Sequence, residues 1–310
     1  MRPIQVTVGP LATASATKIA GAQRAYAAGA LALNGAASNA VSNNIATSHS
    51  PGASAFTLTN TNAANKYLTI TCGSDNSTLT VAVVGVDING TNVLETIALT
   101  NAQISASANR YMTVTSMTPS GSVTGAVVVG TFTVATLDLA RQVLFTTSAS
   151  ESGTTATVYG TDVTGNLISE TISLPASATT VASVLDYKTV YKATVSAALN
   201  DNITFGTNGI AASPWIMIDS WAMSQVAIQC TVSGTVNYTL QQTLDDPNSP
   251  TNAVARASVT WASTSDTALV GATATQQSNY AYPPTYTRVL LNSGTGTVTM
   301  TATQALSAVA

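Results

Sequence analysis

Short runs in which apolar and polar residues alternate are the dominant pattern of this chain. Val226, Ile228, Cys230 and Val232 form one such run, in which every second residue is apolar. A period of two is typical of strands that bury one face. Turn-forming residues separate the runs about every 8 to 12 positions, which is the spacing of β-sandwiches and small barrels. The pattern therefore predicts an all-β protein.

A duplicated stretch lies within this pattern. Residues 160–174 repeat residues 85–99 with the same spacing, Gly-x-Asp-x-x-Gly and then Glu-Thr-Ile. The sequence Tyr-x-Thr-Val then recurs at 111–114 and 187–190. Such repetition indicates duplication of one small domain. Each copy is small for an independent core, so the two copies are expected to pack together or against neighbours.

Each copy is predicted to contain a β-hairpin. Asp87 and Asp162 can hydrogen-bond the backbone of the turn, and the glycine three residues later accepts a positive φ angle. After the turn, Glu95 and Glu170 share the face of the apolar residues that alternate with them. A hard cation such as Ca²⁺ is the alternative partner of these acids, but an EF-hand loop has its glycine at the sixth position and not at the fourth. We therefore interpret them as turn and rim residues and expect no metal site.

Composition divides the chain into four parts. Residues 1–52 are predicted to be an extended N-terminal arm, residues 53–132 the first β-domain repeat, residues 133–209 the second, and residues 214–310 a C-terminal β-sandwich domain. The residues from Gly206 to Pro214 have the composition of a short linker.

The C-terminal part contains all three tryptophans, Trp215, Trp221 and Trp261. A turn at 233–235 and another at 293–296 each join two alternating runs. These turns predict two hairpins.

The N-terminal arm is poor in large apolar side chains. Ile4, Val6 and Val8 alternate with polar residues and predict one short strand, and His49 is expected in a loop. Mostly small and polar residues can hardly offset their own ordering entropy. The arm is expected either to lie along another subunit or to be a loosely attached leading strand. Deletion of residues 1–50 would then leave the domains folded and weaken assembly.

Charge is scarce: 7% of the residues are charged, the net charge is −3, and the ten Lys and Arg residues are scattered singly. Average soluble chains carry about 25% charged residues. Hydroxyl and amide surfaces are common where subunits bury one another, because they cost less to desolvate than Lys or Glu. No basic stripe predicts a nucleic-acid partner, and no apolar run of about 18 residues predicts a membrane helix. Cys72 and Cys230 are predicted to be buried free thiols.

Candidate chemistry is confined to aromatic residues. The single histidine lacks acid or base partners nearby, and no nucleophile elbow, phosphate-binding loop or Cys/His cluster is present, so neither catalysis nor a cofactor is expected. Tyr280, Tyr282 and Tyr286, with Trp261, are candidate contacts for a host glycan or a partner protein, because rings stack on apolar faces of ligands. Packing on the edge of the sandwich is the alternative.

Several segments resemble structural proteins of tailed-bacteriophage particles. The resemblance covers about residues 130–305, and the first repeat echoes it as an additional domain. It implies a non-enzymatic virion component made of β-domains. The segments are Gly-Thr-Asp-x-x-Gly-Asn-x-Ile-Ser-Glu-Thr-Ile at 160–172, Tyr-Lys-Thr-Val at 187–190, Gly-Thr-Asn-Gly at 206–209 followed by Ser-Pro-Trp-Ile, Thr-Val-Ser-Gly-Thr-Val-Asn-Tyr-Thr-Leu-Gln-Gln-Thr-Leu-Asp-Asp-Pro at 231–247, and Arg-Val-Leu-Leu-Asn-Ser-Gly-Thr-Gly-Thr-Val-Thr-Met-Thr-Ala-Thr-Gln at 288–304.

The expected function is therefore structural and the expected location is the virion. Such a chain would assemble with itself and with capsid, portal or tail proteins, as a head decoration (cement) protein or at the head-to-tail collar. A tail-associated or cell-surface adhesin module that binds carbohydrate is the alternative.

Overall fold

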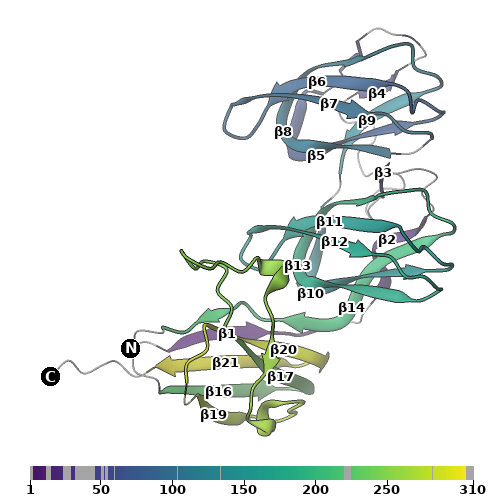
Figure 1. Ribbon diagram of the computed structural model, residues 1–310. Coiled ribbons are helices and arrows are strands. Elements are labelled where there is room, and N and C mark those ends of the chain that lie inside the picture. Colours follow the sequence, from purple (N-terminus) through teal and green to yellow (C-terminus); the bar gives the residue numbers. More distant parts are fainter. Residues whose placement is uncertain are drawn as a thin grey trace.

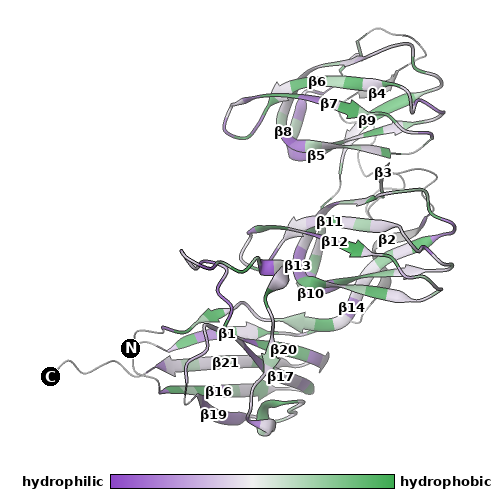
Figure 2. Cartoon of the chain, viewed as in Figure 1, coloured by the Kyte–Doolittle hydropathy of each residue, from purple (hydrophilic) through white to green (hydrophobic). Residues whose placement is uncertain are grey.

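The structure is a computed structural model that describes residues 3–11, 15–23, 29–31, 46–49, 52, 55–58, 60–102, 104–132, 134–219, 225–280 and 282–304. The all-β class is confirmed, since these residues form 21 strands and two short 3₁₀ helices, η1(Arg256–Ser258) and η2(Thr267–Leu269). Three β-domains follow one another along an elongated molecule (Figure 1), each with its own cluster of buried apolar residues. Apolar and polar residues alternate along many of the strands (Figure 2).

The first domain is a sandwich in which one long strand belongs to both layers. Its strands are β4(Ala46–His49), β5(Asn62–Cys72), β6(Thr80–Val86), β7(Asn92–Ala98), β8(Ile104–Pro119) and β9(Val127–Thr131). One layer contains β4, β9, β5 and the first half of β8. The second half of β8 pairs with β6, which pairs with β7. Irregular register along β8 lets it bend from one layer into the other.

The second domain repeats this arrangement. Its strands are β10(Ala135–Thr147), β11(Thr155–Thr161), β12(Leu167–Ser173), β13(Thr180–Val195) and β14(Ile203–Ala212). The long strand β13 pairs first with β10 and then with β11, as β8 does with β5 and β6. The internal repeat in the sequence therefore corresponds to a repeated fold.

Matching hydrogen bonds extend the repeat to the two predicted turns. Asp87 Oδ1 accepts bonds from the N–H groups two and four residues later at 2.8 and 2.9 Å. Asp162 Oδ1 does the same at 2.8 and 3.0 Å. The glycines that follow, Gly90 and Gly165, have φ angles of +77° and +88°. Both hairpins thus form as the turn residues predict.

Gly165→Val is expected to lower the free energy of unfolding by about 1 kcal/mol or more, because a β-branched residue is strained at this φ angle. No atom lies within 4 Å of a Cβ added at Gly165, so the effect isolates backbone conformation. Urea denaturation measures it. Gly165→Asn is the control, since asparagine tolerates the left-handed region. Equal stability of Gly165→Val and wild type would contradict the turn.

The third domain is also a two-layer sandwich. Its strands are β15(Ile216–Met217), β16(Val226–Ser233), β17(Val236–Thr243), β18(Ala262–Ser263), β19(Gln276–Tyr280), β20(Tyr286–Gly294) and β21(Thr297–Gln304), and β1(Ile4–Val8) joins them. One layer has the order β1-β21-β16-β19. The other contains β18, β17 and β20, with β15 and the end of β14 beside β20.

The prediction of two hairpins in this domain is wrong. The turn at 233–235 joins β16 of one layer to β17 of the other, and the turn at 293–296 joins β20 to β21 in the same way. The apolar residues of both strands face one shared core from opposite layers. Alternation reports which face is buried but not which strand is the hydrogen-bonding neighbour.

The N-terminal segment contributes strands to all three domains of its own chain, in the reverse of their order. Strand β1 pairs with β21 of the third domain, and β2(Ser15–Gln23) pairs with β14 of the second. Strand β3(Gly29–Ala30) pairs with both β13 and β8, and so lies between the second and first domains. Strand β4 then pairs with β9 of the first domain.

These pairings correct the expectation of an arm laid on another subunit or loosely attached. Val8 and Leu11 are buried in the core of the third domain, and Leu31 is buried in the core of the second. A few widely spaced apolar residues are sufficient to attach this segment to the domains, because the edges of their sheets supply backbone hydrogen bonds for the rest of it. His49 ends β4 and is not in a loop.

The segment predicted as a linker between the second and third domains is strand. Strand β14 pairs with β10 between Ile203 and Ala211 and with β20 through Ala211 and Ala212, so one strand crosses from one domain into the next. Small residues there permit either conformation, and the two adjacent sheet edges select the strand.

The two cysteines lie in separate cores as predicted. Cys72 is buried in the first domain and Cys230 in the third, and both are free thiols. Among the described residues, no helix has the length and apolar character needed to cross a membrane.

Candidate functional site

The repeated glutamates hold the bends of the long strands. The Glu170 carboxylate accepts hydrogen bonds from the N–H groups of Val184 and Leu185 at 2.8 and 2.9 Å. Glu95 accepts equivalent bonds from the backbone of β8 and a further bond from the Tyr111 hydroxyl at 3.1 Å. Backbone N–H groups thus donate to both carboxylates, and the Tyr111 hydroxyl and the Asn109 amide donate to Glu95 in addition. Within the described ranges, no group of three or more His, Cys, Asp or Glu residues is placed to hold a metal ion.

Cations and tyrosines join the first domain to the second. The Lys192 ammonium lies 4.4 Å from the ring centroid of Tyr67 and 4.3 Å from that of Tyr159, and it donates a hydrogen bond to the Ser107 carbonyl at 2.8 Å. The Arg110 guanidinium lies 4.4 Å from the ring centroid of Tyr191. Because these partners come from both domains, the contacts stabilise the joint.

Burial lowers the pKa of Lys192 to about 8, with the Glu95 carboxylate opposing the shift. Between that pH and about 10.4, the ordinary lysine value, the unfolded chain binds more protons than the folded chain. The Lys192 contribution to stability therefore rises with pH in this window, by about 1.5 kcal/mol from pH 8 to 9.5.

The matched variant Lys192→Met isolates this effect. Buried cysteines and tyrosines act in the opposite direction, because burial raises their pKa values and unfolding lets them ionise. Subtracting the free energy of unfolding of Lys192→Met from that of the wild type, at each pH, removes their common contribution. A difference that stays constant from pH 8 to 9.5 would show that Lys192 has an ordinary pKa.

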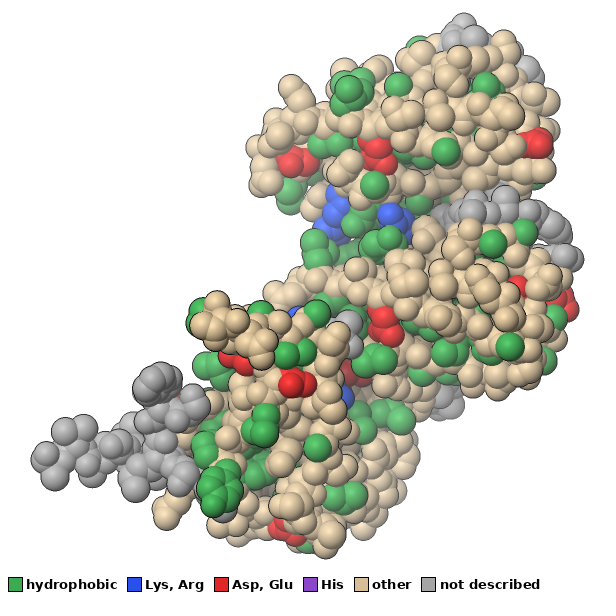
Figure 3. All heavy atoms as spheres, in the orientation of Figure 1, with side chains coloured by type: hydrophobic (Ala, Val, Ile, Leu, Met, Phe, Trp, Pro, Cys, Tyr) green, Lys and Arg blue, Asp and Glu red, His purple; other side chains and the backbone are tan. Residues whose placement is uncertain are grey.

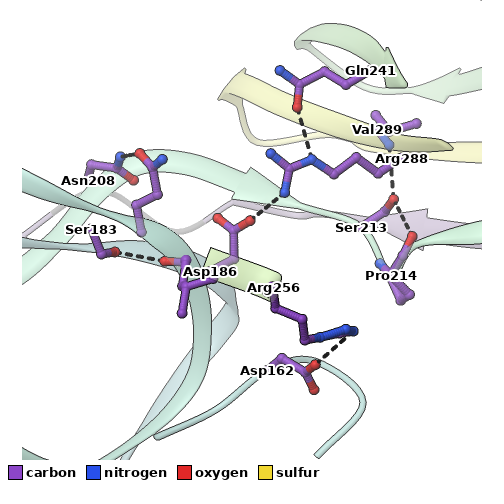
Figure 4. Close-up of polar contacts among 12 residues, drawn as sticks. Asp162, Ser183, Asp186, Asn208, Ser213, Pro214, Gln241, Arg256, Arg288 and Val289 are labelled. Atoms are coloured by element: carbon purple, nitrogen blue, oxygen red, sulfur yellow. Dashed lines mark hydrogen bonds and ion pairs between the residues drawn. The ribbon is translucent and has the colours of Figure 1, made fainter. Parts of the chain in front are cut away.

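A buried ion pair joins the second domain to the third. Arg288 on β20 donates to Asp186 Oδ2 on β13 at 2.8 Å and to Gln241 Oε1 at 2.9 Å (Figure 4). Its guanidinium also lies 4.2 Å from the ring centroid of Trp261. The side chains of Arg288 and Asp186 are 9% and 12% exposed. Burial raises the pKa of Asp186, and the positive charge of Arg288 opposes the shift.

A second Arg–Asp pair lies near the first. Arg256 of η1 is 3.3 Å from Asp162, the aspartate of the repeated turn (Figure 4). The Arg256 guanidinium also lies 4.3 Å from the ring centroid of Trp215. Trp215 packs edge-on against Trp261 and Tyr286, with centroids 5.0 and 5.6 Å apart. In this copy of the repeat, the turn thus becomes a docking point for the third domain.

These residues surround a cavity between the second and third domains. Its volume is about 130 Å³. Aromatic and aliphatic side chains from both domains form most of the lining, and the two Arg–Asp pairs with Asn248 supply polar atoms. Asp186 Oδ1 is itself buried, with less than 1 Å² accessible, and has no hydrogen-bond partner among the described residues. We call this cavity the interdomain cleft.

The four candidate contact residues do not form one surface. Trp261 and Tyr286 line the interdomain cleft, and Tyr280 is buried in the core of the third domain, with its hydroxyl 3.3 Å from that of Thr287. Tyr282 is 87% exposed and does not line the cleft. Successive residues of a strand point to opposite faces and the chain reverses at the prolines, so nearness in sequence did not bring the rings together.

Sequence reasoning missed most of the cleft. Trp215, Arg256 and Arg288 come from the third domain, and Asp162 and Asp186 come from the second. The concentration of tryptophan in the C-terminal part was the available signal. No periodicity could pair those residues with the acids of the repeat.

The first domain presents an uncovered face. Tyr159 and Lys192, which are opposite each other across β11 and β13, contact the first domain. At the equivalent positions of the first domain, Val84 lies opposite Ser116, with Leu94 as its other neighbour. Val84 and Leu94 are 37% and 74% exposed. We call this surface, on β6 and β7 at the end of the molecule far from the second domain (Figure 1), the open face.

Comparison with known proteins adds little. No protein-family model matches the chain, and no curated protein matches it. One solved structure, described as the triple jelly roll fold and turret assembly in an archaeal virus, covers 96% of this chain and 89% of its own at 12% sequence identity and a TM-score of 0.20. A likeness at this level bears on neither fold nor function.

Proposed function

We propose that this protein is a non-enzymatic structural component of a virus particle of the tailed-bacteriophage kind. It would assemble with copies of itself and with other virion proteins, on the head as a decoration protein or at the head-to-tail collar. The motifs at 160–172, 231–247 and 288–304 favour this class through their resemblance to such proteins.

The observation that carries the proposal is the path of the N-terminal segment. Strands β1 to β4 and the crossing strand β14 connect the three domains by backbone hydrogen bonds in addition to side-chain contacts at the joints. Separating two neighbouring domains therefore requires the removal of strands from their sheets. A chain tied in this way suits a role in which it is held at more than one point of a larger assembly.

The surface supports the same function. Acidic side chains are scattered over the face shown in Figure 3, and its basic side chains lie near the two joints between domains, most prominently between the upper two. The open face exposes Val84 and Leu94, with Ser116 opposite Val84, where the second domain carries Tyr159 and Lys192. Surfaces with few charges are cheap to bury against a neighbour.

Light scattering on the purified full-length chain tests the proposal, with electron microscopy of the same sample. We expect a discrete closed oligomer, whose symmetry would distinguish a ring at the collar from a head decoration protein. Leu94→Asp on the open face should shift the mass toward the monomer. Leu244→Asp is the matched control, since Leu244 is 80% exposed on the third domain. A wild-type monomer at every concentration would contradict self-assembly and favour the adhesin alternative.

A further inference from the structure

The interdomain cleft has the composition of a small-molecule site. Such sites are concave, mostly apolar, carry a few convergent polar groups and often lie between domains. Trp215, Trp261, Val163 and Val259 supply apolar surface, and Asn248 supplies an amide. One water needs roughly 10 to 15 Å³ of such space, so a cavity of about 130 Å³ has room for a ligand of about ten non-hydrogen atoms. That is the size of one sugar ring.

Charge in the cleft is balanced before any ligand enters. Arg256 faces Asp162, and Arg288 faces Asp186. A charged ligand would leave a net charge in a poorly solvated space, which is costly. A neutral ligand therefore suits the cleft better than an acid or an amine.

The polar residues that line the cleft carry both hydrogen-bond donors and acceptors. Arg256 and Asn248 line the cleft and carry N–H groups. Hydroxyl groups of a ligand can accept hydrogen bonds from such donors. Trp215 and Trp261 provide rings for the apolar face of the same molecule.

We propose that the interdomain cleft binds a neutral saccharide unit, with its apolar face against the tryptophan side chains and its hydroxyl groups accepting hydrogen bonds from Asn248 and Arg256. This goes beyond the structural role and does not depend on it. The site differs from the tyrosine cluster that the sequence suggested, because Tyr282 lies outside it and Tyr280 is buried in the core.

Saturation-transfer NMR on the full-length chain tests the proposal, using glucose, galactose, rhamnose and N-acetylglucosamine as neutral probes and glucuronate as a charged one. We expect saturable binding of at least one neutral sugar and at least tenfold weaker binding of glucuronate. Each of two variants should weaken the binding of the neutral sugar at least tenfold. Trp261→Ala removes a ring, and Val163→Phe fills the cavity without removing a polar contact.

Tyr282→Ala is the matched control and should bind as the wild type does. Thermal melting of every variant separates loss of binding from loss of folding. Failure of the wild type to bind any of the four neutral sugars would overturn the proposal, as would binding that persists in folded Val163→Phe or is lost in Tyr282→Ala. Mass by light scattering on the same samples reports assembly separately, so the saccharide site can fail while the structural role stands.

Discussion

Deletion of residues 1–31 is expected to prevent stable folding of the second and third domains. It removes β1, β2 and β3 and the buried side chains Val8, Leu11 and Leu31. Burial of these three side chains contributes roughly 5 to 9 kcal/mol, which is comparable to the whole stability of a typical domain. The deletion also exposes β14 and β21 as unpaired edges that can aggregate. Circular dichroism and solubility measure the result.

A shorter deletion serves as an internal control. Removal of residues 1–11 takes away β1 and its two buried side chains from the third domain only. All three tryptophans follow residue 214, and Trp215 and Trp261 line the cleft, so their fluorescence reports the third domain and its joint with the second. We expect that domain to unfold at lower urea while the second keeps its transition. A soluble, cooperatively folded chain without residues 1–31 would restore the expectation of a detachable arm.

Asp186→Ala is expected to destabilise the joint between the second and third domains by about 3 to 5 kcal/mol, because it leaves the Arg288 guanidinium buried without its counter-charge. Gln241 and Trp261 would still contact the guanidinium but cannot neutralise it. Urea denaturation followed by tryptophan fluorescence measures the change.

The double variant Asp186→Leu with Arg288→Met tests the cause. Replacing both members of a buried pair with apolar residues is often neutral or stabilising. Burial also raises the pKa of Asp186 despite the nearby arginine, which indicates that desolvation is not fully offset in the ionised pair. We expect the free energy of unfolding of the double variant to lie within about 1 kcal/mol of that of the wild type. If it were as unstable as Asp186→Ala, shape and not charge would hold the joint.

Local features of the fold were predictable. Gly-x-Asp-x-x-Gly identified two turns correctly because the turn-forming bonds of Asp87 and Asp162 go to residues within four positions, and the conformations of Gly90 and Gly165 are local. Glu95 occupies every second position together with the apolar residues of its strand, which indicated that it lies on the same, inward face. Its partners on β8 were not predictable, because they lie 13 to 16 residues away and depend on where that strand bends.

Pairings between distant residues were not predictable. The turns at 233–235 and 293–296 were correctly placed, but the strands that they join pair with other partners. The cleft shows the same limit, since Arg288 and Asp186 are separated by 102 positions. A site assembled from two domains leaves no spacing pattern in either one.

Strand positions, the duplicated domain, its turns and the buried thiols follow from the amino-acid sequence, because each depends on the period of the chain or on the conformational preference of one residue. The tertiary structure alone decided which edges the N-terminal segment covers and where the scarce charges gather. Basic residues that are scattered singly in the sequence meet at the two joints: Lys66, Arg110 and Lys192 at the first, and Arg256 and Arg288 at the second. These choices depend on contacts between residues tens to hundreds of positions apart, and only the packed chain brings those residues within reach of one another.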